Sequence, residues 1–286
     1  MRDSSSVWFN YNGEFYRAGS AVLTTSQRGF CYGDGLFETL LVQNGRIRLQ
    51  EYHFDRLFAG VGFLGFEPTA SFARESLVQQ VLDLCEKNGH PVLSRVRLMV
   101  FRGEGNLFDT AVNYPQYVIE SSSLSADQVV FNEAGLRVGI YPEGRKACDP
   151  LANLKSNNFL LYVLAARYAR DHHLDDCLVL NSRERIADSC IANLFYIKQG
   201  TVFTPPLSEG CVAGVMRRFL LDRMAVWGLT VREQVVAPED LQNADEIFLT
   251  NALKAIRWVG EIPGRHFEAR VTRELYNMVH NEFQVG

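Results

Sequence analysis

The sequence predicts a two-domain protein that mixes α+β and α/β organisation. Its 286 residues suffice for two domains with separate cores, and 47% of them are hydrophobic. Strand-like alternation and helix-like spacing of apolar residues follow one another along the whole chain. The small, polar stretch Ser121–Asp127 has the composition of a linker. We therefore expect a small α+β domain over residues 1–121, a linker at 122–127 and a larger domain over residues 128–286.

The N-terminal domain is expected to open with alternating, aromatic-rich segments. An Asn44-Gly45 turn between Phe37–Val42 and Arg46–Leu49 predicts a β-hairpin. Apolar spacing and the break at Gly89-His90-Pro91 predict the other elements. These are helices at 53–63 and 71–88, followed by strands at 94–101 and 117–120.

The C-terminal domain is predicted to alternate strands and helices more regularly. A turn at Gln199-Gly200 separates two apolar segments and indicates a strand pair. The predicted strands are 136–141, 177–180, 191–197, 202–204 and 247–250. The predicted helices are 157–172, 215–227 and 272–283.

Composition favours a small-molecule partner. The net charge is −4 with both signs mixed along the chain, so nothing indicates a nucleic-acid or anionic-membrane surface. No apolar run approaches the roughly 20 residues that span a bilayer, so we expect a cytoplasmic protein. The six cysteines are widely spaced, which favours reduced thiols over disulfides or a zinc site. A nucleophilic cysteine is a minor alternative.

Lys155 is the lysine best suited to imine chemistry. It precedes a strongly apolar stretch that begins near Phe159, and such surroundings would lower the pKa of an ammonium. Lys87 and Lys198 adjoin turns, and Lys146 follows Arg145 in a polar loop, where solvated lysines are common. A structural lysine that only covers apolar surface is the alternative for Lys155.

Three further segments are candidates for binding groups. The glycine-containing turn Ser208–Arg217 leads into an apolar helix, so its backbone N–H groups could hold an anion, or it could be a simple turn. Asp188 enters an apolar strand, where it could pair with a protonated pyridine nitrogen or with Arg185, or it could lie in a surface turn. Arg56 could bind a phosphate or form an exposed ion pair with Asp55.

Six motifs in one order resemble the class IV aminotransferases, which are fold-type-IV pyridoxal-5'-phosphate (PLP) enzymes. The family includes branched-chain aminotransferases, D-amino-acid aminotransferases and 4-amino-4-deoxychorismate lyases. The resemblance implies a D-amino-acid-aminotransferase-like fold with a C-terminal pseudo-barrel domain, and a homodimer. The motifs are Arg28–Thr39, His53–Leu57, Leu154–Asn158, Asp188–Phe195, Ala213–Arg217 and Thr250–Ala252.

The resemblance also implies roles for residues at the cofactor. Lys155 would form the Schiff base with PLP and carry the proton between substrate Cα and the cofactor. Asp188 would face the pyridine nitrogen where the family has glutamate, with Asp176 as an alternative. The phosphate would be bound by Arg56, Asn251 and the backbone N–H groups of Val215, Met216 and Ala252.

On the substrate side, the motifs resemble the lyase branch most closely. Arg97 would lie near the substrate carboxylate, and Tyr32 and Thr39 would help position the substrate. The sequence predicts an aminotransferase-like enzyme acting on an amino acid or amino-substituted carboxylate. One alternative is an aminodeoxychorismate lyase that releases 4-aminobenzoate and pyruvate for folate synthesis. The other is a catalytically silent relative that binds PLP without turnover.

Overall fold

The chain divides into two compact units. The computed structural model describes residues 7–109 and 113–285. The first unit comprises residues 1–128 and 155–158, and the second comprises residues 129–154 and 159–286. The predicted linker at 122–127 ends just before the first of these divisions, although Ser122 and Ser123 still belong to a strand of the first unit. The assignment of residues 155–158 to the first unit is a structural finding that the sequence did not indicate.

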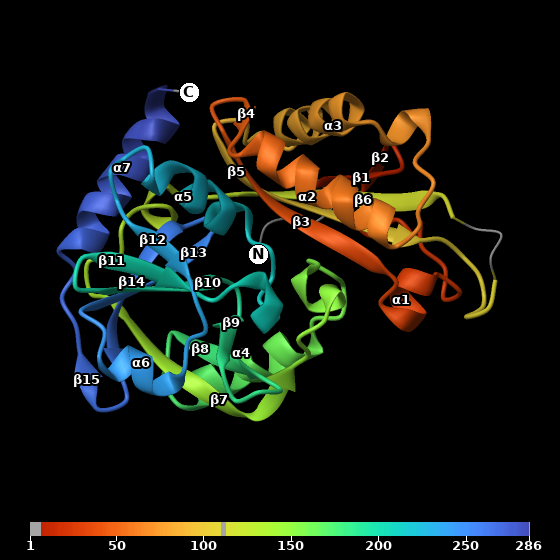
Figure 1. Cartoon of the computed structure of the whole chain (residues 1–286). Coiled ribbons are helices and arrows are strands. Elements are labelled where there is room, and N and C mark those ends of the chain that lie inside the picture. The colour runs from red at the N-terminus through yellow and green to blue at the C-terminus, as the bar shows by residue number, and fades with distance from the viewer. Residues whose placement is uncertain (1–6, 110–112, 286) are drawn as a thin grey trace. The chain divides into compact units, whose positions relative to one another are not determined.

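The first unit is built on a six-stranded antiparallel sheet in the order β2-β1-β6-β5-β3-β4. The longer helices α2 and α3 pack on it (Figure 1). Its elements are β1 (Trp8–Tyr11), β2 (Glu14–Arg17), α1 (Arg28–Tyr32), β3 (Gly35–Gln43), β4 (Arg46–Ile47), α2 (Gln50–Phe63), η2 (Ala70–Phe72), α3 (Arg74–Lys87), β5 (Leu93–Arg102), β6 (Pro115–Ser123) and η3 (Ala126–Gln128).

The predicted hairpin of the first unit is confirmed. Strands β3 and β4 pair in antiparallel fashion, with Val42 opposite Ile47. Asn44 and Gly45 connect them with φ values of 51° and 73°, the left-handed conformations that a tight two-residue turn requires. The sequence of the turn thus fixes the register of the strand that carries Phe37, Glu38 and Thr39.

The second unit contains a curled nine-stranded sheet of mixed direction. Its main path runs β12-β11-β10-β13-β14-β7-β8-β9, and β15 pairs with β14. Its elements are β7 (Leu136–Lys146), η4 (Pro150–Asn153), α4 (Leu160–Asp171), β8 (Asp176–Asn181), β9 (Ile186–Ser189), β10 (Asn193–Lys198), β11 (Thr201–Thr204), η5 (Leu207–Glu209), α5 (Val215–Met224), β12 (Val231–Glu233), α6 (Pro238–Gln242), β13 (Glu246–Asn251), β14 (Ala255–Ile262), β15 (Arg265–His266) and α7 (Val271–Val285).

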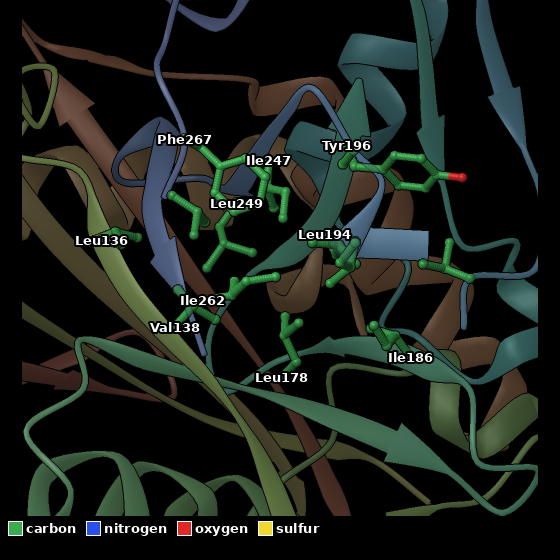
Figure 2. Close-up of a cluster of buried hydrophobic side chains, with 14 of the residues drawn as sticks. Leu136, Val138, Leu178, Ile186, Leu194, Tyr196, Ile247, Leu249, Ile262 and Phe267 are labelled. Atoms are coloured by element: carbon green, nitrogen blue, oxygen red, sulfur yellow. The ribbon is translucent and has the colours of Figure 1, made fainter. Parts of the chain in front are cut away.

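The core of the second unit lies inside the curled sheet. Leu178, Leu194, Leu249 and their neighbours form one buried apolar cluster there, as Figure 2 shows. Alternate residues of β8 point the other way, so that Val179 packs with α4 in a second cluster. Because β8 is buried on both faces, it is apolar without alternation, which is typical of an interior strand.

Several predicted elements differ from the structure, two of them close to the candidate site residues. The helix predicted at 157–172 begins only at Leu160, because residues 155–157 are extended and bond to the first unit. Strand β7 does not end at Tyr141 but continues to Lys146, with a bulge after Tyr141.

All six cysteines are free. No helix within residues 7–109 and 113–285 has both the length and the apolar character needed to cross a membrane.

Candidate active site

Lys155 belongs to a short extended segment that adds to the sheet of the first unit. Its carbonyl accepts the N–H of Phe37 at 2.9 Å, and Asn157 donates its N–H to the carbonyl of Gly35 at 3.0 Å. A Cβ added at Gly35 would lie 2.3 Å from the carbonyl oxygen of Val100 on β5 and 2.6 Å from Asn157 Nδ2, so glycine fits best between β5 and this segment. The glycine of the predicted motif therefore lets the segment dock against the start of β3.

The side chains of Lys155 and Arg97 both lie over the aromatic ring of Phe37. The Nζ of Lys155 lies 4.3 Å from the centroid of the Phe37 ring, and the Cζ of Arg97 lies 4.8 Å from it. Thr39 pairs directly with Arg97 across β3 and β5. Since alternate residues of a strand share a face, Phe37 and Thr39 lie on the face opposite Glu38. The first unit therefore gathers Lys155, Arg97 and Thr39 on one face of its sheet.

A groove of about 880 Å³ opens on this face. Arg97 and Arg95 line it together with Glu120, which pairs with Arg97 across β5 and β6. The Nε of Arg97 is buried and has no hydrogen-bond partner among the described residues. The groove thus presents guanidinium groups suited to a carboxylate.

Tyr32 belongs to the region that precedes β3. It ends the short helix α1, is about half exposed, and its ring lies 5.6 Å from the Cζ of Arg28. The next residue, Gly33, has a φ of 65° and accepts a hydrogen bond from the side chain of Asn158 at 3.3 Å. The residue after Tyr32 is therefore hydrogen-bonded to the end of the Lys155 segment.

Arg56 points into a buried ionic cluster on the helix-covered face of the same sheet. Its Nε and Nη2 donate to the two carboxylate oxygens of Glu38 at 2.8 and 2.6 Å. The Nδ1 of His53 lies 2.7 Å from Glu38 Oε2, so the neutral imidazole donates this hydrogen. Asp55 pairs instead with Arg74 of α3. The Arg56 side chain is only 14% exposed, so it is not the exposed ion-pair residue considered from the sequence.

The cluster keeps Glu38 ionised in the folded protein. Burial opposes ionisation, but Arg56 and His53 together hold the pKa of Glu38 at about 2. Burial lowers the pKa of His53 despite the nearby carboxylate. A negative charge on Glu38 therefore fixes the orientation of the Arg56 guanidinium over the whole physiological pH range.

Acid should destabilise the wild-type protein more than Glu38→Gln. The folded-state pKa of Glu38 is depressed, so its stabilisation is complete above the unfolded-state value of 4.5 and is lost as pH falls toward 2. Between pH 6 and pH 3 the wild type should lose about 2 kcal/mol more free energy of unfolding than Glu38→Gln. Urea unfolding followed by circular dichroism at each pH measures this, and parallel profiles would contradict it.

In the second unit, Asp188 lies on β9 and is almost fully buried. Its Oδ2 accepts hydrogen bonds from Lys146 Nζ, Tyr162 OH and the backbone N–H of Val212, each at 2.9 Å. Its Oδ1 is buried and has no hydrogen-bond partner in the described part of the chain. Asp188 is thus anchored through one oxygen, while the other retains its full capacity to accept.

The expectation that Lys146 is a solvated loop lysine is wrong. Lys146 is the last residue of β7, where it pairs with Asn181 of β8, and its side chain is only 6% exposed. Its Nζ also donates to the Tyr162 hydroxyl. Arg185, the protein cation considered for Asp188, bonds to Glu209 instead. The cationic partner of Asp188 therefore comes from a strand 42 residues earlier in the chain.

The loop before α5 packs on Asp188 and Asn193. Val212 donates to Asp188 and accepts from the Asn193 side-chain amide at 2.8 Å. A Cβ on Gly214 would lie 1.8 Å from Asn193 Oδ1, so any other residue there would displace the Asn193 side chain. Helix α5 then starts at the buried residues Val215 and Met216, and the first N–H groups of a helix lack intrahelical partners. The second unit thus places a helix start close to Asp188.

Arg217 faces away from the start of this helix. Its Nη2 donates to the carbonyl of Pro205 at 2.9 Å and to the carboxylate of Glu233. Arg217 is 4% exposed, and these bonds tie α5 to the neighbouring loop and to β12. Any anion site at this helix start therefore depends on backbone groups rather than on Arg217.

The other two predicted phosphate-side residues lie at the end of β13. Asn251 Oδ1 accepts the N–H groups of Leu253 and Lys254 at 3.1 and 2.8 Å, which forms the turn that contains Ala252. Thr250 pairs with Asn193 across β13 and β10, and its buried Oγ1 has no partner among described residues. The turn at 251–254 is thus joined through Asn193 to the loop that holds Asp188.

Asp176, the alternative to Asp188, is fully engaged by protein groups. Its oxygens accept the Ser189 hydroxyl at 2.9 Å and the N–H groups of Cys177 and Cys190 at 2.8 and 3.1 Å. Burial raises its pKa. Its hydrogen bonds are those of a structural residue, which leaves Asp188 as the carboxylate with an oxygen to offer.

The fold, with an antiparallel sheet and helices in one unit and a curled mixed sheet in the other, is that of a fold-type-IV PLP enzyme. The sequence profile of the family Amino-transferase class IV matches residues 35–262, so the chain belongs to this family. Members of the family are PLP-dependent aminotransferases or lyases. The predicted family, fold and cofactor are therefore confirmed.

Relatives of both activities match the chain over most of its length. The aminodeoxychorismate lyase of Vibrio harveyi is 29% identical, covering 82% of this chain and 85% of its own. The branched-chain-amino-acid aminotransferase of Escherichia coli K12 is 26% identical, and the match covers 90% of this chain and 85% of the relative. The crystal structure of 4-amino-4-deoxychorismate lyase from Pseudomonas aeruginosa is 30% identical, covers 96% of this chain and 98% of its own, and has a TM-score of 0.82.

The donor set fits PLP. The Oδ1 of Asp188 receives no hydrogen bond from any described protein group. It can therefore accept the N–H of a pyridinium ring. The helix start at Val215 and the guanidinium of Arg56 are chemically suited to a phosphate. Lys155 supplies the primary amine.

Proposed function

We propose that this enzyme acts on an amino acid or an amino-substituted carboxylate, with Lys155 as the lysine that binds PLP. The observation that carries the proposal is the placement of Lys155 Nζ and the Arg97 guanidinium at the same Phe37 ring. A reactive amine and a carboxylate-binding group thus lie on one face of the first unit. An amino acid presents the matching pair of groups to them.

Each cofactor-binding residue has a proposed task. Asp188 accepts the ring N–H through Oδ1. Arg56, held by Glu38, binds the phosphate together with Asn251 and the N–H groups of Val215, Met216 and Ala252. The packing of the 212–216 loop on Asp188 and Asn193 supports a common role for the residues of the second unit.

The chain itself moves one proton and binds the substrate. PLP, when bound, withdraws electrons from the substrate Cα and so stabilises the carbanion that forms there. Lys155 Nζ would hold PLP and would accept the substrate Cα proton as general base. Arg97 binds the carboxylate, Thr39 beside it positions the reacting fragment, and Tyr32 contacts the substrate from α1.

A second candidate function is aminodeoxychorismate lyase. The identity of 30% to the Pseudomonas aeruginosa lyase, over nearly the full length of both chains, favours this reaction. The lyase reaction shares Cα deprotonation with transamination and then eliminates pyruvate, so that 4-aminobenzoate is formed. The two arginines of the groove, Arg95 and Arg97, also suit a substrate with two carboxylates.

A paired assay distinguishes the candidates. The PLP-loaded enzyme is given aminodeoxychorismate and scored for 4-aminobenzoate, and in parallel it is given glutamate with a panel of keto acids. Formation of 4-aminobenzoate alone assigns the lyase, and amino-acid formation alone assigns the aminotransferase. Loss of the product with Arg97→Leu would support the carboxylate role of Arg97. Absence of either product would contradict the proposed function and favour a silent PLP-binding relative.

We also propose a cytoplasmic homodimer. Each unit exposes large apolar side chains, such as Phe108 on the first unit and Leu160 and Val163 on the second. Exposed apolar groups of this size are typical of surfaces that bind another protein chain. Sedimentation velocity of the full chain should give the mass of a dimer, and a monomer at micromolar concentration would contradict this.

A further inference from the structure

The hydrogen bonds of Asp188 are unequally divided between its two oxygens. Three donors meet at Oδ2, and one of them, Lys146, is a cation. The side chains of Lys146 and Asp188 are only 6% and 3% exposed. Water therefore screens this pair weakly, and the ammonium charge acts at close range on anything that shares the carboxylate.

Lys146 dominates the charge around Asp188. The titratable side chains considered around the carboxylate come from β7, β8, α4, α5, the end of β9 and the loop before α5. Burial raises the pKa of the Tyr162 hydroxyl and of the Cys190 and Cys211 thiols, and the pKa of Cys211 is about 11. These three groups are therefore neutral at physiological pH. Arg217 is paired with Glu233, and Asp176 is bonded to Ser189. The groups concerned are Lys146, Tyr162, Cys190, Cys211, Arg217 and Asp176.

We propose that Lys146 weakens the pull of Asp188 on the proton of the PLP ring nitrogen. This inference rests on the proposed role of Asp188 toward PLP. A carboxylate that already pairs with an ammonium attracts a second proton less than an unshared carboxylate, and two nearby positive charges disfavour each other. Lys146 is a positioning and tuning residue that acts through Asp188 and does not touch the cofactor.

The functional consequence concerns the strength of the electron sink. A protonated ring nitrogen withdraws electrons more strongly than a neutral one, so the charge at Lys146 sets how strongly the cofactor stabilises negative charge at Cα. Asp188 replaces the glutamate that the family resemblance implies at this position, and in this chain it comes with a buried lysine at Oδ2. The ring environment is therefore set by the pair Lys146–Asp188 rather than by one carboxylate.

The test is a titration of the ring nitrogen in the holoenzyme. The protein is loaded with PLP labelled with ¹⁵N in the ring, and the ¹⁵N chemical shift is followed against pH. Lys146→Gln keeps an N–H donor for Oδ2 but removes the charge, so the midpoint should rise by about one pH unit or more. Lys146→Arg keeps the charge and should titrate like the wild type. Arg145→Met removes an exposed neighbouring cation that pairs with Glu184 and should also leave the midpoint unchanged.

The outcomes separate this inference from the function on which it rests. An unchanged or lower midpoint in Lys146→Gln overturns the proposal, and Lys146→Met serves as a second uncharged variant if the glutamine variant does not fold. Asp188→Asn is measured beside them. If it leaves the ¹⁵N shift unchanged, the assignment of Asp188 to the ring nitrogen fails. If it shifts the ring toward the neutral form while Lys146→Gln has no effect, only the inference about Lys146 fails.

Discussion

Lys155→Ala should lose catalytic turnover by at least about 10³-fold, together with the yellow colour of PLP-loaded protein. The variant lacks the primary amine that both binds the cofactor covalently and removes the Cα proton. Its fold should persist, because the hydrogen bond between the Lys155 carbonyl and the N–H of Phe37 on β3 does not depend on the side chain. Absorbance after PLP incubation and single-turnover kinetics measure the two losses.

A lysine of the second unit provides the control for this variant. Lys198 ends β10 beside the Gln199-Gly200 turn, and Lys198→Ala removes the same charge at a site unrelated to the cofactor residues. It should keep both colour and turnover. If Lys155→Ala retains the coloured species, the assignment of the cofactor lysine is wrong.

Asp188→Asn should lower turnover by about 10²-fold, because it removes the negative charge proposed to hold the ring proton. Asp188→Glu should retain most activity, since it keeps the charge and adds one methylene group. The amide also leaves Lys146 buried without its counter-ion, which costs about 3–5 kcal/mol of stability. Thermal unfolding of the holoenzyme must therefore accompany the kinetics.

The comparison between the two Asp188 variants separates charge from packing. Loss of turnover in the asparagine variant with an unchanged cofactor content points to the electron sink. Equal loss in the glutamate variant would point to steric fit in the buried pocket, where an added methylene is costly. Full activity in Asp188→Asn contradicts a role for this carboxylate at the ring.

The sequence predicted the elements whose signals are local. The β3–β4 hairpin follows from Asn44-Gly45, and α2 and α3 follow from apolar residues at helical spacing. Strand β9 was missed because it has only four residues, two of them polar, and lies just before the strand predicted at 191–197. Helix α4 was placed three residues early because the backbone of residues 155–157 is committed to β3, a constraint that lies far away in the sequence.

The candidate site was predictable to the extent that motifs mark it. Lys155 and Asp188 stood out by residue type and by apolar neighbours. Lys146 did not, because its burial depends on β7 continuing past a bulge to pair with β8. Glu38 is likewise an acidic residue in an apolar strand whose partners, His53 and Arg56, lie on the following helix. Such pairs depend on which strands and helices become neighbours, which residue spacing alone does not specify.

The segment at residues 155–158 has a consequence for how the chain matures during synthesis. The first unit is not contiguous, since it needs four residues that emerge from the ribosome about 30 residues after Gln128. Until then the N–H of Phe37 lacks the Lys155 carbonyl, and the start of β3 remains an unpaired strand edge. A nascent chain halted at residue 128 would expose this unpaired strand edge. A chain extended beyond residue 158 has the segment that pairs with it. The lysine proposed to bind the cofactor thus also belongs to the segment that closes the first unit.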